Sequence, residues 1–260
     1  MKKSDRMRQK ILALLQCHGA LRVKEAAAAL NCSEVTIRQY FAELEKAHLL
    51  LRTHGGVRLL PENPPEYSFQ SVSASKVKEK RAIARECLTR IRDNDRLFFD
   101  SGTSVRECGN ILAAEEEKLE NIVIVTNSMA LCSALASLYP VTVTGGVFRP
   151  KRMDLCGCVA QSQICRYSFT KAILGVDGIG ENGELYTTDE ESAALASAAA
   201  EHSMEIFVLC DSSKIFRSSL ISYGTLADSK ITLITDSGIT EEHLLALRKC
   251  GAEKIVIADC

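Results

Sequence analysis

The stretch SEVTIRQYFAELEKAHLLLRTHGG, residues 33–56, decides how the first part of the chain is expected to fold. It opens with Ser33, a residue type that favours the N-cap of a helix, and Ile37, Phe41 and Leu44 then recur at helical spacing. The apolar runs LLLRT and VRLL flank HGG, which is typical of a β-hairpin. The stretch therefore predicts one capped helix that leads into a hairpin.

Two further helices are expected ahead of this stretch. Met7, Ile11, Leu14 and Leu15 repeat at helical spacing before HGA interrupts the pattern. A short helix follows over residues 24–30, and the turn LNCS separates it from the helix that Ser33 caps. Two helices joined by a short turn form a helix-turn-helix candidate, and the hairpin behind them would be its wing.

The second helix of such a motif lies in the major groove of DNA, where its N-terminal residues reach base edges. The candidate DNA-contacting residues are Ser33, Glu34, Thr36, Arg38 and Gln39 on the helix, with Arg52 and His54 on the hairpin. Arginine pairs bidentately with guanine and glutamine with adenine, whereas the hairpin residues would hold phosphates. The alternative is a small helical subdomain that packs, dimerises or acts as a protein–protein adaptor.

Charge is distributed unevenly along the chain and favours DNA as the partner. Residues 1–60 hold 11 Lys and Arg against 5 Asp and Glu, a charge of +6. The remaining residues hold 21 against 28, a charge of −7, so the overall charge of −1 hides the difference. A basic small domain on an acidic larger one is expected if only the first domain meets nucleic acid.

The N-terminal residues resemble a known family at this point. S-x-x-T-I-R at residues 33–38 and L-x-R-x-H-G-G at residues 50–56 are similar to the N-terminal domain of the DeoR family of bacterial transcription regulators. The family usually reads T-I-R-R-D-L, and this chain has Gln39, Tyr40 and Phe41 after Arg38. An arginine and an aspartate are therefore replaced, which leaves the operator sequence open.

The rest of the chain predicts a larger α/β domain. PENPPE, residues 61–66, holds three of the five prolines and marks a linker, placed at residues 61–72. Beyond it, short apolar strands alternate with helical segments, the pattern of a mainly parallel sheet covered on both faces. The predicted strands are RLFFD, NIVIVTN, VTVTGG, KAILGVD, EIFVLCD, KITLITD and KIVIA. The fold class is thus α/β, with a winged helix-turn-helix domain at residues 1–60 and a mainly parallel α/β domain at residues 73–260.

Small and polar residues follow several of these strands. They are DSGTS at 100–104, TNS at 126–128, TGG at 144–146, GVDG at 175–178 and DSSK at 211–214. Ligands of open parallel sheets bind beyond the carboxyl ends of the strands, and a strand–SGTS–helix sequence offers backbone N–H groups to a phosphate. Ordinary turns favour the same residue types, so the sequence leaves both readings open.

The resemblance continues through this domain and implies a ligand. The motifs F-D-S-G-T-S, V-T-N-S, L-C-G, D-G-I and D-S-S-K follow the effector domain of the DeoR family in order. That domain resembles the sugar-phosphate isomerase fold without its chemistry, which implies a phosphorylated sugar as the signal. The effector-binding candidates are Asp100, Gly102, Thr103, Ser104, Asn127, Gly145, Asp177 and Lys214.

Two features that suggest other activities are weaker. GIGENG, residues 178–183, satisfies G-x-G-x-x-G, but no helix is expected before about Asp189, so a dinucleotide site is not predicted. An active isomerase would need a carboxylate base, for which Glu184, Asp189, Glu190 and Glu191 are candidates. An acidic run before a helix is more simply a cap and a favourable charge on the helix dipole.

Composition bounds the remaining possibilities. None of the eleven cysteines forms a C-x-x-C, so the spacing predicts neither a metal site nor another cofactor. No apolar run reaches the roughly 20 residues that span a bilayer, and a cytoplasmic protein without a membrane partner is expected. The sequence predicts a repressor of a carbohydrate operon that binds double-stranded operator DNA as a homodimer or homotetramer. The alternative is an active sugar-phosphate isomerase with a helical regulatory appendage.

Overall fold

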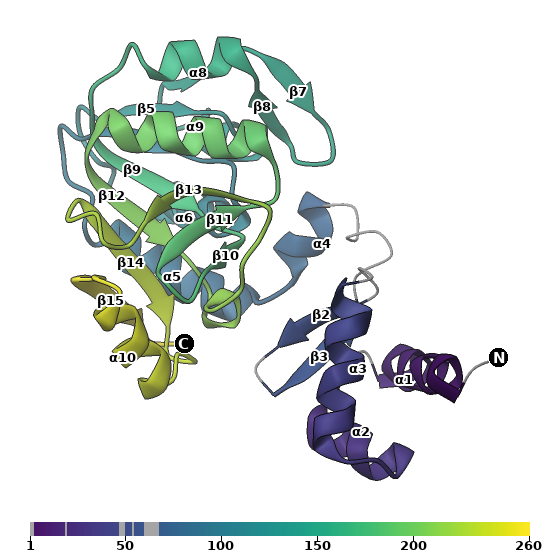
Figure 1. Cartoon of the computed structure of the whole chain (residues 1–260). Coiled ribbons are helices and arrows are strands. Elements are labelled where there is room, and N and C mark those ends of the chain that lie inside the picture. The colour runs from purple at the N-terminus through teal and green to yellow at the C-terminus, as the bar shows by residue number, and fades with distance from the viewer. Residues whose placement is uncertain (1–2, 19, 47–49, 54, 60–67) are drawn as a thin grey trace. The chain divides into compact units, whose positions relative to one another are not determined.

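The computed structural model describes residues 3–18, 20–46, 50–53, 55–59 and 68–260 (Figure 1). Its internal contacts divide the chain into two units, Met1–Tyr67 and Ser68–Cys260. The larger part of the predicted linker lies outside the described residues. Residues 68–72, which were assigned to that linker, belong to the second unit, where α4 (Phe69–Ala74) begins. Among the described residues, no helix is long and apolar enough to cross a membrane.

The N-terminal unit has the predicted three helices and hairpin. Its elements are α1 (Lys3–His18), β1 (Ala20–Arg22), α2 (Val23–Leu30), α3 (Glu34–Lys46), β2 (Leu50–Thr53) and β3 (Gly56–Leu59). The three strands form an antiparallel sheet in the order β1-β3-β2. β1 was not predicted, because a three-residue strand is too short to show a period.

The core of this unit explains why the quoted stretch folds as it does. Ile37, Phe41 and Leu44 are buried on one face of α3, together with Ile11 and Leu15 of α1. The hairpin turn places Gly56 against β1, where an added Cβ would lie 2.6 Å from the Leu21 carbonyl oxygen. Only glycine allows this close approach, so HGG fixes both the turn and the packing of the wing.

The C-terminal unit is built on a seven-stranded parallel sheet in the order β15-β14-β12-β9-β4-β5-β6 (Figure 1). These strands are β4 (Arg96–Phe99), β5 (Val123–Thr126), β6 (Val141–Val143), β9 (Phe169–Gly175), β12 (Ser203–Leu209), β14 (Ile231–Asp236) and β15 (Lys254–Ala258). Each one corresponds to a predicted strand, and every pairing between them is parallel. The predicted fold class is confirmed.

Helices cover both faces of this sheet. They are α5 (Val77–Leu88), α6 (Thr103–Ala114), α7 (Met129–Leu135), α8 (Cys158–Ile164), α9 (Glu190–Glu201) and α10 (Glu241–Lys249). One apolar cluster includes side chains of α5, α6 and α7, and the other includes side chains of α8, α9 and α10. Successive strand residues alternate between the two, so Phe98 belongs to one cluster and Leu97 and Phe99 to the other.

Short antiparallel strands outside the main sheet were not predicted. They are β7 (Val147–Arg149), β8 (Asp154–Cys156), β10 (Gly178–Ile179), β11 (Glu184–Thr187) and β13 (Ile221–Thr225). β7 pairs with β8, and β10, β11 and β13 form a second small sheet. The GIGENG segment spans β10 and the turn to β11, and α9 begins only at Glu190, as the sequence predicted.

The strand order places a topological switch point at β4 and β9. From β4 the chain moves outward to β5 and β6, whereas from β9 it moves the other way to β12, β14 and β15. The connections that leave the carboxyl ends of β4 and β9 therefore diverge. A crevice opens between such connections, and it is where ligands of open α/β sheets bind.

A buried ion pair joins the same two strands at their amino ends. Lys171 Nζ donates to Asp95 Oδ1 and Oδ2 at 2.7 and 2.8 Å, and both residues are buried. Burial by itself would raise the pKa of Asp95, but hydrogen bonds from Lys171, the Arg92 N–H and Thr170 lower it below its ordinary value. The charged pair therefore stabilises the fold.

We expect Asp95→Asn to destabilise the protein by about 3 kcal/mol at neutral pH, because Lys171 would keep a buried charge without its partner. A depressed folded pKa contributes stability that is present above the unfolded pKa of about 4 and is lost as the pH falls further. Thermal unfolding of wild type and Asp95→Asn between pH 3 and pH 8 should show that their difference in stability shrinks below about pH 4. A difference that is constant over this range would contradict the ion-pair account, and Glu117→Gln, at an exposed position, is the control.

Candidate DNA-binding surface and ligand site

The amino end of α3 is capped as predicted. The Thr36 N–H donates to Ser33 Oγ at 3.1 Å, and the Ser33 and Thr36 hydroxyls lie 2.9 Å apart in a mutual hydrogen bond. Both hydroxyls therefore have a structural role in the unbound protein. Such a cap is worth about 1 kcal/mol, and it orients the first turn that carries the other candidate residues.

The remaining candidates on α3 lie on its solvent side. Arg38 and Gln39 are exposed, and Arg38 Nη2 lies 2.7 Å from Glu34 Oε2, one turn earlier. An exposed pair of this kind is worth only about 0.3–0.5 kcal/mol, so Arg38 can leave Glu34 for a base at little cost. Val35, which is 64% exposed, was missed, although its methyl groups suit contact with a thymine methyl.

The hairpin candidates are only partly described. Arg52 is exposed on β2, and its Nη1 lies 3.5 Å from the Arg38 carbonyl oxygen, so the two arginines lie close together. His54 lies outside the described residues. Tyr40 and Phe41, which depart from the family pattern, contribute to the core of the unit, where Phe41 is fully buried and Tyr40 packs against it. Their replacement therefore changes packing rather than the exposed face of α3.

The ligand candidates after β4 and β9 meet at the switch point. Gly102 is the N-cap of α6, and no side chain caps this helix end. A Cβ added at Gly102 would lie 3.1 Å from Gly175 Cα, so the two loops pass in backbone contact. Thr103 and Ser104 form the first turn of α6 and are buried. An uncapped helix start with a positive dipole end is suited to an anion.

Asp100 lies at the centre of this arrangement. Its Oδ2 accepts a hydrogen bond from the Gly175 N–H at 3.1 Å. Burial raises the pKa of Asp100 to about 6, and the nearby carboxylates of Asp154 and Asp177 add to the rise, whereas the Ser101 and Gly175 N–H groups oppose it. The site therefore holds a carboxylate whose charge is disfavoured when no cation or hydroxyl group is bound to it.

Asp177 and Lys214 anchor the backbone around Gly175. Asp177 Oδ2 accepts hydrogen bonds from the Thr188 N–H at 3.0 Å and from the Thr187 and Thr188 hydroxyls at 3.1 Å. Lys214 Nζ donates to the Val176 carbonyl oxygen at 2.8 Å, which brings the loop after β12 to the loop after β9. Both side chains thus lie at the carboxyl edge of the sheet, as predicted. Asp177 is hydrogen-bonded there to two threonines, and Lys214 is hydrogen-bonded to a backbone carbonyl oxygen.

Asn127 and Gly145 behave differently from each other. Asn127 is 1% exposed, and its Oδ1 has no hydrogen-bond partner among the described residues, whereas its Nδ2 lies 3.4 Å from the Leu155 carbonyl oxygen. A buried amide oxygen without a donor is costly and is a natural point for a ligand hydroxyl to bind. The Gly145 N–H already donates to Gln163 Oε1 at 2.6 Å, so this glycine is engaged in packing against α8.

A hydrogen-bonded ring of charged side chains beside the site was missed. Arg149 donates to Asp154 Oδ1 and Oδ2 at 2.8 and 2.6 Å and to Asp189 Oδ1 at 2.7 Å, and Ser101 Oγ lies 3.1 Å from Asp154 Oδ2. Burial opposes the charged form, but Asp154 and Asp189 raise the pKa of Arg149 overall. Arg152 also pairs with Asp189, at 3.0 Å. Arg149 and Arg152, which follow the TGG turn, are therefore partly buried.

The same ring assigns a role to one candidate isomerase base. Asp189 is the N-cap of α9, where it accepts a hydrogen bond from the Ser192 N–H at 3.0 Å while also pairing with Arg149. These contacts lower its pKa although burial opposes the shift. Glu190 and Glu191 occupy the first turn of α9, as expected for a favourable interaction with the helix dipole.

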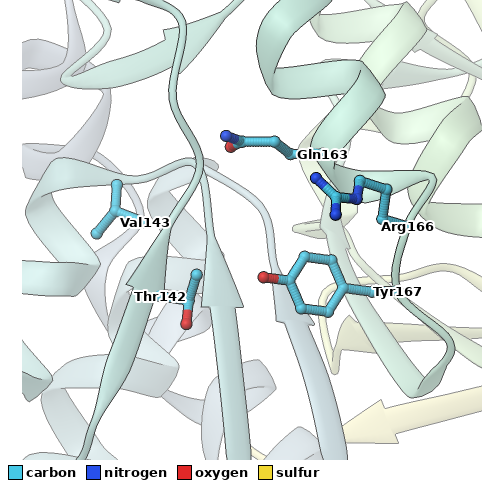
Figure 2. Close-up of a pocket in the computed structure, with 5 residues that line it drawn as sticks. All are labelled: Thr142, Val143, Gln163, Arg166 and Tyr167. Atoms are coloured by element: carbon cyan, nitrogen blue, oxygen red, sulfur yellow. The ribbon is translucent and has the colours of Figure 1, made fainter.

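A separate cavity of about 400 Å³ lies next to the edge strand β6. Figure 2 shows Thr142 and Val143 on one side of it and Gln163, Arg166 and Tyr167 on the other. None of the predicted site residues lines this cavity, although Gly145 is tied to Gln163. Within the described part of the chain, no group of three or more His, Cys, Asp and Glu residues is arranged to hold a metal ion.

Comparison with known proteins identifies both units. A family model described as a DeoR-like helix-turn-helix domain matches residues 8–63, and one described as the DeoR C terminal sensor domain matches residues 75–237. The chain belongs to the DeoR family. It is a DNA-binding transcriptional regulator, and the family resemblance of its sequence motifs is confirmed.

Two relatives of similar length are named as repressors. The chain is 31% identical over 257 residues to a putative aga operon transcriptional repressor of Escherichia coli O157:H7, covering 97% of this chain and 93% of the relative. It is 30% identical over 248 residues to a lactose phosphotransferase system repressor of Staphylococcus epidermidis, covering 94% and 96%. Both DeoR units are therefore shared along nearly the full length.

Solved structures give a weaker likeness. Ribose 5-phosphate isomerase A of Neisseria gonorrhoeae superposes with a TM-score of 0.39 and 17% identity, covering 54% of each chain. The likeness thus extends over about half of either protein. At this level it says nothing about the ligand or activity of the DeoR protein.

We expect Asp100→Asn to stabilise the unliganded protein at pH 7.5 by on the order of 2–3 kcal/mol, because the amide removes a buried charge and can still accept from the Gly175 N–H. A folded pKa raised from about 4 to about 6 gives stability that is full below pH 4 and is lost as the pH rises through 6. The gain should therefore be small at pH 4.5.

Thermal unfolding of wild type and Asp100→Asn at pH 4.5, 6 and 7.5 measures this dependence, with Glu117→Gln as an exposed control. An equal effect of Asp100→Asn at all three values would show that Asp100 is not a buried charge with a raised pKa.

Proposed function

We propose that this DeoR-family regulator is a repressor of a carbohydrate-metabolism operon, and that a phosphorylated sugar bound at the switch point alters its hold on operator DNA. The observation that carries the ligand assignment is the uncapped start of α6 at Gly102, in backbone contact with Gly175. The names of the relatives, an aga operon repressor and a lactose phosphotransferase system repressor, support the class of operon.

The roles of the site residues follow from their chemistry. The N–H groups at the start of α6 and the hydroxyls of Thr103 and Ser104 would bind the phosphoryl oxygens, with Lys214 adding a positive charge. The carboxylates of Asp100 and Asp177 accept hydrogen bonds and suit the sugar hydroxyls, and Asn127 offers an amide oxygen with no donor among the described residues. Gly145 would act through the packing of its turn, since Gln163 already holds its N–H.

A regulator without enzymatic activity fits these contacts better than an isomerase. An isomerase needs a carboxylate that is free to take a proton from the substrate. Asp189 is held by Arg149 and the start of α9, and its lowered pKa makes it a weak base. The relatives named as repressors point in the same direction.

The partners follow from the DNA-binding unit. One helix-turn-helix unit reads one half-site, so a homodimer or homotetramer is needed to hold two half-sites of double-stranded operator DNA. A cytoplasmic location agrees with this partner. By linkage, a sugar phosphate that weakens operator binding must itself be bound more weakly by the DNA-bound protein.

The DNA-binding role is tested on the purified full chain with DNA from upstream of its own gene and with random DNA, across a range of salt concentrations. We expect a steep loss of affinity with salt and a clear preference for the upstream DNA. Arg38→Ala should weaken specific binding by about 1–3 kcal/mol and leave random DNA little affected, because Arg38 is proposed to read a base.

Glu43→Ala, on α3 but paired with Arg8 of α1, is the matched control and should retain the preference. Equal weakening of specific and random DNA by Arg38→Ala would make Arg38 a phosphate contact. Equal binding of both DNAs by the wild type would contradict the proposed operator function.

The effector role is tested by Lys214→Ala. We expect it to weaken the binding of whichever sugar phosphate releases or recruits DNA in a panel of such compounds by at least about tenfold, because a cation next to the phosphoryl group is lost. Operator binding without the compound should survive. Lys230→Ala is the matched control, since Lys230 Nζ also donates to a backbone carbonyl, that of Ala200, but precedes β14 at the amino end of the sheet. An unchanged response in Lys214→Ala would contradict the assignment.

A further inference from the structure

Lys80 is a buried charged residue of the C-terminal unit. It lies in the first turns of α5 and is 1% exposed. Its Nζ donates to the carbonyl oxygens of Val72 and Ser75, at 2.8 Å in the latter case. No carboxylate of the described residues lies within ion-pair distance, so one of the three ammonium N–H donors has no partner there. A buried cation held only by carbonyl oxygens is poorly compensated.

Two contacts bring the surroundings of Lys80 to the start of α6, where the proposed effector site lies. Arg106 in the first turn of α6 lies over the Phe69 ring of α4, and Arg81, next to Lys80, pairs with Glu107 of α6 at 3.2 Å. Burial and, to a smaller extent, the positive charge of Lys214 lower the pKa of Lys80 to about 8. Asp211 in the loop after β12, Glu107 on α6 and Glu79 on α5 act in the opposite direction but do not restore the ordinary value. Two lysines thus repel each other where no anion is present, and an anion bound near both would offset the repulsion.

Lys80 also holds the end of α4. This short helix is held at three points: its Phe69 N–H donates to the Lys151 carbonyl oxygen at 2.9 Å, and the Arg106 guanidinium lies 5.5 Å from the centre of the Phe69 ring. The third point is the Lys80 ammonium at the Val72 and Ser75 carbonyl oxygens. Since α4 begins two residues after Tyr67, it is the first helix of the sensor unit that follows the DNA-binding unit along the chain.

We propose that Lys80 is a positioning residue of the effector site: its ammonium turns from the Val72 and Ser75 carbonyl oxygens towards the bound phosphoryl group, and this frees the end of α4. The inference rests on the proposed effector function, and it names α4 as the first element to respond when the effector binds. The long side chain can turn about its own bonds, and the unpaired N–H lowers the cost of leaving the carbonyl oxygens.

The charge state gives the proposal a pH dependence. Lys80 is mostly protonated at pH 7 and mostly neutral at pH 9. A dianion stabilises the protonated form, so anion binding raises the pKa of Lys80 and anion affinity falls as the pH rises through 8.

The experiment uses sulfate as a phosphoryl analogue whose charge is constant between pH 7 and pH 9. Binding to the full chain is followed through the backbone amide signals of Gly102 and Thr103 at matched ionic strength. We expect the sulfate affinity of wild type to fall by about tenfold from pH 7 to pH 9, as the protonated fraction of Lys80 does. Lys80→Arg should bind at both values with little change, because arginine stays charged.

Lys80→Met should bind about tenfold more weakly at pH 7 and show no pH dependence, and Lys254→Met, which removes a lysine held by the Ser229 carbonyl oxygen, should behave as wild type. Amide hydrogen exchange at residues 72–76 should increase when sulfate binds to wild type. In Lys80→Met it should be fast from the start and unchanged by sulfate.

Two results would overturn the proposal in different ways. In the first, sulfate moves the Gly102 and Thr103 signals of wild type, but its affinity is independent of pH and exchange at residues 72–76 does not change. That result would support the effector site but show that Lys80 is not part of it. Signals of Gly102 and Thr103 that do not respond to sulfate, under conditions where Lys80 still titrates near 8, would contradict the effector site itself.

Discussion

The contact between the loops that leave β4 and β9 is the constraint on which the sensor unit depends. Gly102 and Gly175 approach so closely that a single Cβ on either would meet the backbone of the other at 3.1–3.2 Å. This contact places the start of α6 at the switch point, where the chain leaves β4 and β9 in opposite directions. Asp154, Asp177 and Lys214 then lie around this contact. A larger residue at either position would push the two loops apart by a few tenths of an ångström.

Charged groups of both signs lie at this edge of the sheet. Asp100 is half-buried and lies close to Asp154 and Asp177. Arg149 offsets part of this charge by holding Asp154 and Asp189. Lys214 and Lys80 are held by backbone carbonyl oxygens and not by carboxylates, so their positive charge is not fully compensated within the protein. A phosphorylated sugar would compensate both kinds of charge, because its phosphoryl group can pair with the lysines and its hydroxyls can donate hydrogen bonds to the carboxylates.

Sequence reasoning reached the main architecture because its signals are local. Helical spacing of Ile37, Phe41 and Leu44 and the runs of apolar strand residues reflect periods that burial imposes on neighbouring positions. The site was predicted only as a set of strand ends, since parallel strands bring their carboxyl ends to one edge. Partners that come from distant segments gave no such signal. Arg149 and its partner Asp189 lie forty positions apart, so nothing in the sequence indicated that they pair. The burial of Lys80 was not predicted either, because burial of a single lysine leaves no periodic pattern.

The regulator is proposed to couple operator DNA to a phosphorylated sugar bound at the switch point, and such coupling must be reciprocal. The affinity of the full chain for an active sugar phosphate should be measured without DNA and with saturating operator DNA, beside the affinity for the operator with and without the sugar phosphate. The account predicts that the two ratios are equal and differ from one by about 5- to 150-fold. A sugar phosphate that binds equally well with and without operator DNA would contradict it.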